Sequence, residues 1–187
     1  MIDVFFCSVP GEDPVREFIA QVCLERWKRE PNATVIRVTP SLLDCCDVDF
    51  QKERRVFADQ EAVGPYYIVA DDDCLLDSPP ILDDCRAAMH FDFGVVALWP
   101  DNHKMGPWTS VPEGYKPYED RWLLEHAAAG GIRFCRKGAL ETWPEPKTKT
   151  ATYDGEHAEA LRAMGMRTGY FKRILMYHLG KGRSTVR

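Results

Sequence analysis

The sequence predicts one α/β domain in which helices cover both faces of a mostly parallel central sheet. Residues 2–9 form a continuous apolar run, a helical pattern follows, and residues 34–38 form a second short run. This strand, helix, strand order is typical of parallel sheets. Residues 66–70 are apolar or aromatic without alternation, as in a strand buried on both faces. With 187 residues, 45% of them hydrophobic, the chain can bury the core of one domain.

A helix is predicted between the first two strands. It begins near Pro14, which suits a first helical turn, and it ends before Pro31. Its predicted buried face consists of apolar residues that recur at helical spacing: Val15, Phe18, Ile19, Val22, Cys23 and Trp27.

The second strand ends at Pro40 and leads into a predicted loop. Residues 50–63 then predict a helix with one basic edge, and Gly64-Pro65 ends it directly before the buried strand. The basic edge consists of Lys52, Arg54 and Arg55.

Two long segments without regular patterning separate the remaining elements, and segments of this length inside a compact domain indicate functional or disordered loops. Asp154 is the predicted N-cap of the last helix. In order, we predict a helix at 78–89, a strand at 93–99, an irregular segment at 100–125, a strand at 132–135, an irregular segment at 143–152, a helix at 154–164 and short strands at 167–170 and 174–177.

Composition narrows the class of protein. The net charge of −5 does not indicate binding to nucleic acid or to an anionic membrane. The seven cysteines include no CxxC pair, so they are predicted to be reduced thiols rather than zinc ligands or disulfides. No apolar run approaches the roughly 18 residues that a membrane span needs, and the N-terminus lacks the basic start of a signal peptide. We therefore expect a cytoplasmic protein without membrane insertion.

The buried strand at 66–70 ends in three carboxylates, Asp71, Asp72 and Asp73. Ligands bind beyond the carboxyl ends of strands in α/β sheets, and three adjacent anions call for a cation. Mn²⁺ or Mg²⁺ would suit two carboxylates together with the oxygens of a substrate diphosphate. The alternative is that these residues cap the next helix or form a solvated turn.

In the order of these parts, the chain resembles the nucleotide-sugar glycosyltransferases of the GT-A fold, as a minimal, single-domain, family-2-like member. The strand that ends at Asp71–Asp73 is similar to the family's DxD strand, and Arg55 matches its upstream basic residue. Gly130-Gly131 resembles the family's glycine loop, and His178 its C-terminal metal ligand. The resemblance implies a Rossmann-like sheet with a nucleotide-binding half at residues 1–99, an acceptor and catalytic half at 100–179 and a flexible basic tail at 180–187.

The resemblance also implies roles for individual residues. Asp154 lies at a predicted helix start about a dozen residues before Gly165, which matches the spacing of the family's catalytic base. Tyr153 replaces the glutamate that precedes this base in the family, so Glu156 is the reserve candidate. His157 is a candidate acceptor contact. The implied metal ligands are Asp73 and His178, with Asp71 beside them. The implied nucleotide-binding residues are Val9, Pro10, Arg55, Asp71, Asp72, Gly130, Gly131, Lys181 and Arg183.

The implied activity is transfer of a sugar from a nucleoside-diphosphate sugar, with UDP as the first candidate, to an acceptor hydroxyl with inversion. A saccharide is the default acceptor, and a hydroxymethylated base in phage-type DNA is the alternative, although the net negative charge argues against DNA. Two other classes stay open: a metal-dependent nucleotidyltransferase and a non-catalytic nucleotide-binding member of the fold. The oligomeric state is not indicated.

Overall fold

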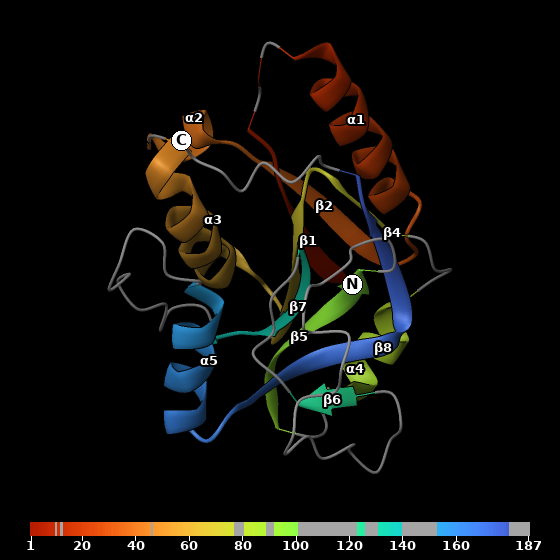
Figure 1. Ribbon diagram of the computed structural model, residues 1–187. Coiled ribbons are helices and arrows are strands. Elements are labelled where there is room, and N and C mark those ends of the chain that lie inside the picture. Colours follow the sequence, from red (N-terminus) through yellow and green to blue (C-terminus); the bar gives the residue numbers. More distant parts are fainter. Residues whose placement is uncertain are drawn as a thin grey trace.

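The computed structural model describes residues 1–9, 11, 13–45, 47–76, 81–88, 92–100, 123–125, 131–139 and 153–179. Within these residues, an eight-stranded sheet is covered by helices (Figure 1). The strands are β1 (Ile2–Cys7), β2 (Ala33–Val38), β3 (Tyr66–Asp71), β4 (Cys74–Leu76), β5 (Phe93–Pro100), β6 (Leu123–Glu125), β7 (Ile132–Arg136) and β8 (Arg167–His178). The helices are α1 (Pro14–Lys28), α2 (Pro40–Leu43), α3 (Asp47–Glu61), α4 (Leu82–Ala88) and α5 (Tyr153–Ala163).

The strands follow the spatial order β2-β1-β3-β7-β5-β8-β4, and β6 also pairs with β8. β1 is parallel to both β2 and β3, and β5 is parallel to β8. β7 runs antiparallel between β3 and β5, while β4 and β6 run antiparallel to β8. Strands β1, β2, β3, β5 and β8 therefore share one direction, which confirms the mostly parallel sheet.

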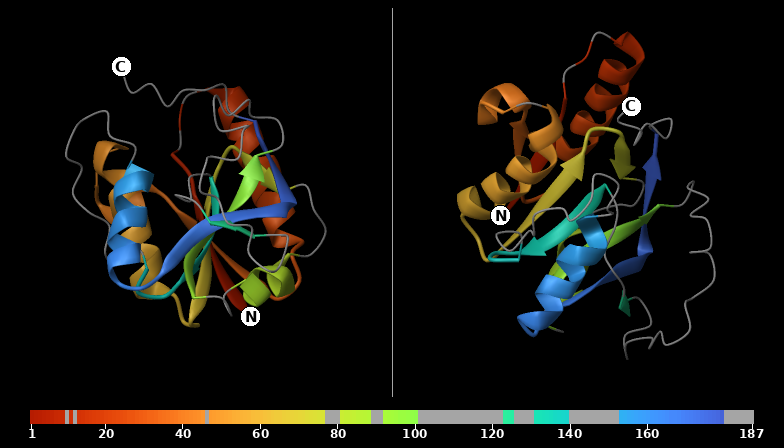
Figure 2. Two further views of the ribbon diagram at one scale, coloured as in Figure 1. Left: turned by 60° about the horizontal axis from the view of Figure 1, so that its bottom comes forward. Right: turned by 60° about the vertical axis from the view of Figure 1, so that its left-hand side comes forward.

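Two apolar clusters lie on opposite faces of this sheet, which confirms that helices cover both faces. On one face, Phe6 and Ile68 pack with Trp27 of α1 and Cys85 of α4. On the other, Tyr67 packs in a cluster with residues of α3 and α5. Figure 2, left, shows α3 and α5 together on one side of the sheet and α1 on the other.

The sheet curls at its carboxyl end. Only Asp72 and Asp73 separate β3 from β4, yet β7, β5 and β8 lie between these two strands in the spatial order. The far edge of the sheet must therefore come back toward β3 at this end. This closure brings the C-terminal strand β8 next to the three aspartates.

Helix α1 buries a narrower face than predicted. Ile19 packs against the core and Cys23 and Trp27 are buried, but Val15, Phe18 and Val22 are exposed. Apolar residues at positions 15, 18 and 22 are themselves helically spaced, so they form a second stripe beside the buried one, and sequence spacing merged the two.

Other predicted elements need correction. The predicted loop after β2 contains helix α2, with Thr39 as its N-cap, and α3 begins at Asp47 rather than at residue 50. The irregular segment at 100–125 ends in β6, and the two short strands at the C-terminus are one strand, β8. Helix α5 begins at Tyr153, so Asp154 lies in its first turn instead of capping it. Pairing with β5, β6 and β4 supports β8 along its length, which no local pattern indicates.

Candidate active site

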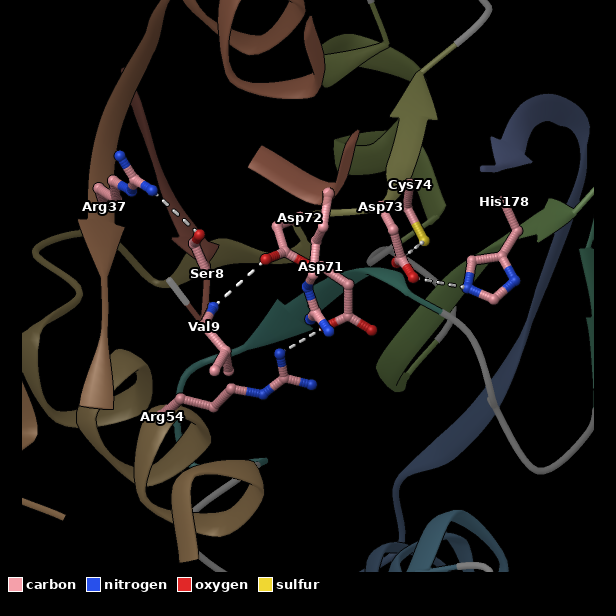
Figure 3. A network of polar contacts seen from close by, with 10 residues as sticks. Ser8, Val9, Arg37, Arg54, Asp71, Asp72, Asp73, Cys74 and His178 are labelled. Carbon is pink, nitrogen blue, oxygen red and sulfur yellow. Dashed lines mark hydrogen bonds and ion pairs between the residues drawn. The ribbon is translucent and has the colours of Figure 1, made fainter. Parts of the chain in front are cut away.

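The candidate site lies where the chain reverses its winding direction. From β1 the chain passes to β2 on one side and then returns to β3 on the other side. In α/β sheets the crevice at such a switch point, outside the carboxyl ends of the strands, is the usual ligand site. Here Val9 lies just beyond β1, Asp71 is the last residue of β3, and Asp72 and Asp73 follow it, so these residues lie together at the switch point (Figure 3).

Asp71 is paired with an arginine of α3. Its Oδ1 lies 2.5 Å from Nη1 of Arg54, whose side chain is 5% exposed. Although burial opposes the charged guanidinium, the neighbouring Asp71 carboxylate raises the pKa of Arg54 above its ordinary value. Asp71 also donates its backbone N–H to the carbonyl of Gly131 at 2.6 Å. The carboxylate at the tip of β3 is therefore held by a fixed positive charge.

Asp72 joins the ends of β1 and β3. Its Oδ2 accepts a hydrogen bond from the backbone N–H of Val9 at 3.2 Å, and its Oδ1 lies 3.4 Å from Nη2 of Arg16 on α1. Burial raises the pKa of Asp72, and the charge of Arg16 opposes that shift. The Asp72 side chain thus links the end of β3 to the residues after β1 and to α1.

Asp73 faces the end of β8. Because β4 pairs with β8 in a register that sets Cys74 opposite His178, the imidazole reaches Asp73: His178 Nε2 lies 3.2 Å from Asp73 Oδ2. Burial acts to raise the pKa of Asp73, but the hydrogen bond and charge of His178 outweigh it, so the pKa is lowered. The same hydrogen bond raises the pKa of His178.

Gly131, directly before β7, allows β7 to pack closely against the acidic turn. A Cβ at this position would lie 2.0 Å from Cys74 Sγ and 3.2 Å from Asp71 Oδ2. Any side chain here would displace the cysteine, so the glycine is required for close approach of β7 to the acidic turn. This places one residue of the predicted glycine loop beside the aspartates.

These residues fit a divalent cation. One ligand atom from each of Asp73, Cys74 and His178 can lie within 4.8 Å of the others. Carboxylate and imidazole together suit Mn²⁺, and carboxylate oxygens also suit Mg²⁺. Asp71 is not part of this group, and its carboxylate pairs with Arg54.

Helix α5 directs its N-terminus toward the same end of the molecule. A short turn connects the C-terminus of α5 to β8, and β8 runs toward the site. The two elements are therefore antiparallel, and the N-terminus of α5 faces the site end of the molecule (Figure 1). His157 is buried, and its Nε2 donates to the carbonyl of Ala139 at 2.7 Å, beyond β7. It therefore anchors α5 to the turn after β7, and its predicted acceptor contact stays a prediction. Asp154, three residues earlier, lies about 4.5 Å closer to the site along the helix.

A neighbouring contact fixes the position of α3 along its axis. Asp59 of α3 accepts hydrogen bonds from the Tyr67 hydroxyl and, at 2.8 Å, from the backbone N–H of Gly138, one residue before Ala139. The turn after β7 thus holds both α3 and α5. Arg54 precedes Asp59 by five residues, about 7.5 Å along α3 toward the site.

The sequence predicted part of this arrangement. It brought together Val9, the aspartates, Gly131 and His178, but it chose Arg55 where Arg54 makes the described ion pair with Asp71. Arg55 is buried as well, and its predicted role as a nucleotide contact stays a prediction. The adjacent pair Arg54-Arg55 was the available signal. Cys74 and Arg16 were missed, since nothing in their local sequence marks them.

Several predicted residues are not described in full. Asp154 and Glu156 lie on α5, but the structure does not describe their side chains. Outside the described residues are Pro10, Gly130, Lys181 and Arg183.

Comparisons with known proteins identify the fold. No family model matches the chain, and no curated protein matches its sequence. Among solved structures, S. aureus TarS is similar with a TM-score of 0.62 and 11% identity, over 96% of this chain and 36% of that chain. A mannosyltransferase from Pyrobaculum calidifontis, in complex with GDP-Man and Mn²⁺, has a TM-score of 0.61 and 13% identity, over 98% of this chain and 58% of that one.

A nucleotidyltransferase-like enzyme is also similar. The CMP:2-keto-3-deoxy-manno-octonic acid synthetase complexed with CTP has a TM-score of 0.55 and 14% identity, over 92% of this chain and 90% of that chain. The protein therefore has a GT-A-like fold shared by nucleotide-sugar transferases and related nucleotidyltransferases. It spans less than two thirds of the two transferase chains. No helix within the described residues combines the length and apolar character that crossing a membrane requires.

Proposed function

We propose that the protein is a glycosyltransferase that moves a sugar from a nucleoside-diphosphate sugar to an acceptor hydroxyl. One observation carries the proposal: Asp73 and His178, 105 residues apart, meet at 3.2 Å at the crevice of a GT-A-like fold. A carboxylate and an imidazole at this place are suited to hold Mn²⁺ or Mg²⁺. When bound, such an ion neutralises charge on the leaving diphosphate.

The nucleoside would lie on the β1 side of the crevice and the diphosphate on the β8 side. Val9 would border the nucleoside, near the point where Arg37 of β2 donates a hydrogen bond to Ser8 Oγ at 3.1 Å (Figure 3), and Pro10 stays a proposed nucleotide contact. Asp71, held by Arg54, would face the ribose. Asp72 is occupied by Val9 and Arg16, so we assign it to bracing the crevice and not to nucleotide contact.

The chemistry is a single displacement. The acceptor oxygen forms a bond to the anomeric carbon while the bond from that carbon to the diphosphate oxygen breaks, and its electron pair leaves with the nucleoside diphosphate. The carboxylate of Asp154 takes the proton of the acceptor hydroxyl, with Glu156 as the reserve base. The configuration at the anomeric carbon inverts. Gly130-Gly131 would border the sugar, and Lys181 and Arg183 would contact the diphosphate.

The acceptor is proposed on chemical class alone. A saccharide is the first candidate and a hydroxymethylated DNA base the second, with residues 100–179 contributing to acceptor recognition. A UDP-sugar is the first donor to test, followed by GDP-sugars. The cytoplasmic location and the single-domain division into two halves stay predictions.

A panel of nucleotide sugars tests the proposal directly. Each donor is incubated with the protein and Mn²⁺ or Mg²⁺, and released nucleoside diphosphate is measured, because transferases often hydrolyse donors slowly when no acceptor is present. Metal-dependent release from at least one donor supports the proposal. Glycan acceptors and hydroxymethylated oligonucleotides are then compared as acceptors.

A nucleotidyltransferase is the second candidate, since the CTP-bound synthetase shares the fold. That reaction consumes a nucleoside triphosphate and releases pyrophosphate. Incubation with the four nucleoside triphosphates and sugar phosphates separates the two reactions by their products. Metal-dependent nucleotide binding with neither product would instead identify a non-catalytic member of the fold.

A further inference from the structure

The metal group contains a sulfur that the proposed activity does not use. Cys74 Sγ lies 3.5 Å from Asp73 Oδ1, and Asp73 Oδ2 lies 3.2 Å from His178 Nε2. The three side chains offer ligand atoms that all lie within 4.8 Å of one another. An Asp, Cys, His group at this spacing is a ligand set for a thiophilic ion, not only for Mn²⁺ or Mg²⁺.

The position of the sulfur is built into the fold. Cys74 begins β4 directly opposite His178 of β8, and it is fully buried. A Cβ at residue 131 would lie 2.0 Å from Sγ, so the sulfur occupies the space that Gly131 leaves open. Asp73 and His178 each keep 27% of their side-chain surface exposed, which leaves the group accessible from the solvent side.

The chemistry separates two classes of cation. Mn²⁺ and Mg²⁺ prefer oxygen ligands and leave a neutral thiol protonated, whereas Zn²⁺ and Cd²⁺ bind thiolate strongly enough to displace its proton. Cys74 would therefore join the ligand set with a thiophilic ion and not with Mn²⁺ or Mg²⁺.

We propose that Asp73, Cys74 and His178 form a three-ligand site for Zn²⁺ or Cd²⁺ that competes with the catalytic cation and inhibits the enzyme. The competition rests on the proposed function; the site itself does not. Binding releases the thiol proton to solvent, as the sulfur–metal bond replaces the S–H bond.

The inhibition follows from coordination number. Protein-bound Zn²⁺ is usually four-coordinate, so three protein ligands leave one open position. Mg²⁺ sites keep fewer protein ligands and more positions for water and phosphate oxygens. A zinc-loaded site would therefore hold a diphosphate poorly while it excludes Mn²⁺ or Mg²⁺ from Asp73 and His178.

Spectroscopy with Co²⁺ and Cd²⁺ tests the ligand set without any activity. We would use a protein in which Cys45 and Cys46, two thiols adjacent in sequence, are both replaced by serine to remove background binding. One equivalent of either ion should give a thiolate-to-metal charge-transfer band that chelator abolishes. Cys74→Ser should lose the band. Cys23→Ser, a buried cysteine of the same apolar cluster, should keep it.

Affinities give the second readout. In competition with a chromophoric chelator, Cys74→Ser should weaken Zn²⁺ binding by about a hundredfold or more, while Mn²⁺ affinity changes by less than about twofold. Unchanged Zn²⁺ affinity in Cys74→Ser, or no charge-transfer band in the Cys45→Ser, Cys46→Ser protein, overturns the site. If Cys74→Ser does not fold, His178→Gln replaces it, and loss of the band is again expected.

Nucleotide binding distinguishes this proposal from the function on which its inhibitory part rests. Calorimetry with Mn²⁺ and a nucleoside diphosphate is repeated after one equivalent of Zn²⁺ is added. We expect Zn²⁺ to abolish the binding. Nucleotide binding that survives Zn²⁺ overturns the inhibition, whereas absence of Mn²⁺-dependent binding together with a charge-transfer band overturns the proposed function and leaves the metal site standing.

Discussion

Asp72 and Asp73 are adjacent in sequence but sit in opposite environments. Asp72 is buried and held by the Val9 N–H and by Arg16, and its pKa is raised. Asp73 is partly exposed, its described ionisable partner is His178, and its pKa is lowered. Asp71 resembles Asp72 in being held by an arginine, Arg54.

The difference divides the acidic turn into a structural side and a reactive side. An arginine is always charged at neutral pH, so it neutralises its carboxylate permanently. A histidine can lose its proton and share a cation with its carboxylate. Only the Asp73 side, among the described residues, therefore combines a carboxylate with a partner that can become a metal ligand.

The largest effect should come from the proposed catalytic base, Asp154. Asp154→Asn keeps the size of the side chain but removes the proton acceptor, so turnover should fall by about two to four orders of magnitude. Donor affinity and melting temperature should stay nearly unchanged. Glu156→Gln is the matched control on the same helix. A silent Asp154→Asn with an inactive Glu156→Gln would transfer the role of base to Glu156.

On the structural side, Arg54→Met should lower the free energy of unfolding by about 3 kcal/mol, because it leaves the Asp71 carboxylate without its buried partner. Urea denaturation measures this loss. The double variant Arg54→Met, Asp71→Asn should recover part of it, since the unpaired charge is gone. Strictly additive losses would show that the two residues do not act as a pair.

His178→Ala should weaken Mn²⁺ affinity by roughly ten- to a hundredfold, the scale expected when a metal site is degraded. Because Asp73 raises the pKa of His178, a proton competes with the ion, and Mn²⁺ affinity of the parent should fall as the pH drops through that raised pKa. Metal titrations at several pH values check both points. An affinity independent of pH and of His178 would return this residue to a structural role.

The smallest expected effect is the difference between the pKa values of Asp72 and Asp73. In ¹³C NMR of the metal-free protein, the Asp72 carboxyl should take up its proton at higher pH than Asp73 as the pH falls. The raised pKa of Asp72 means that its ionised form opposes folding at neutral pH. Asp72→Asn should nevertheless change the free energy of unfolding by less than about 1 kcal/mol, because its partner Arg16 is half exposed. The Asp73 contribution has the opposite sign and is lost as the pH falls through its lowered pKa. The reverse order of titration would contradict the division.

Local patterns predicted the strands well. Continuous apolar runs marked β1, β3 and β5 because a buried strand needs both faces covered, and breakers such as Pro31 and Gly64-Pro65 marked helix ends. The exposed stripe of α1 was mistaken for core because helical spacing alone does not say which stripe faces the sheet. The length of β8 depends on pairing with three strands, which no local pattern contains.

The residues of the candidate site that belong to a sequence motif could be predicted. Those that reach the site only through the sheet topology could not. Three consecutive aspartates mark the turn, and the resemblance pointed to His178. The role of Cys74 depends on the β4–β8 register and on the space left by Gly131, and the choice between Arg54 and Arg55 depends on the rotation of α3. Both are set by tertiary packing.

Calorimetric titration with UDP and GDP, with and without Mn²⁺, on the parent and on Asp73→Ala tests the central claim most directly. We predict nucleotide binding that requires Mn²⁺ in the parent and is lost in Asp73→Ala, with an unchanged circular dichroism spectrum because removing one of three adjacent anions relieves repulsion. Asp72→Asn, the neighbouring control, should keep the binding. An Asp73→Ala variant that binds nucleotide with the same Mn²⁺ dependence as the parent would contradict the account.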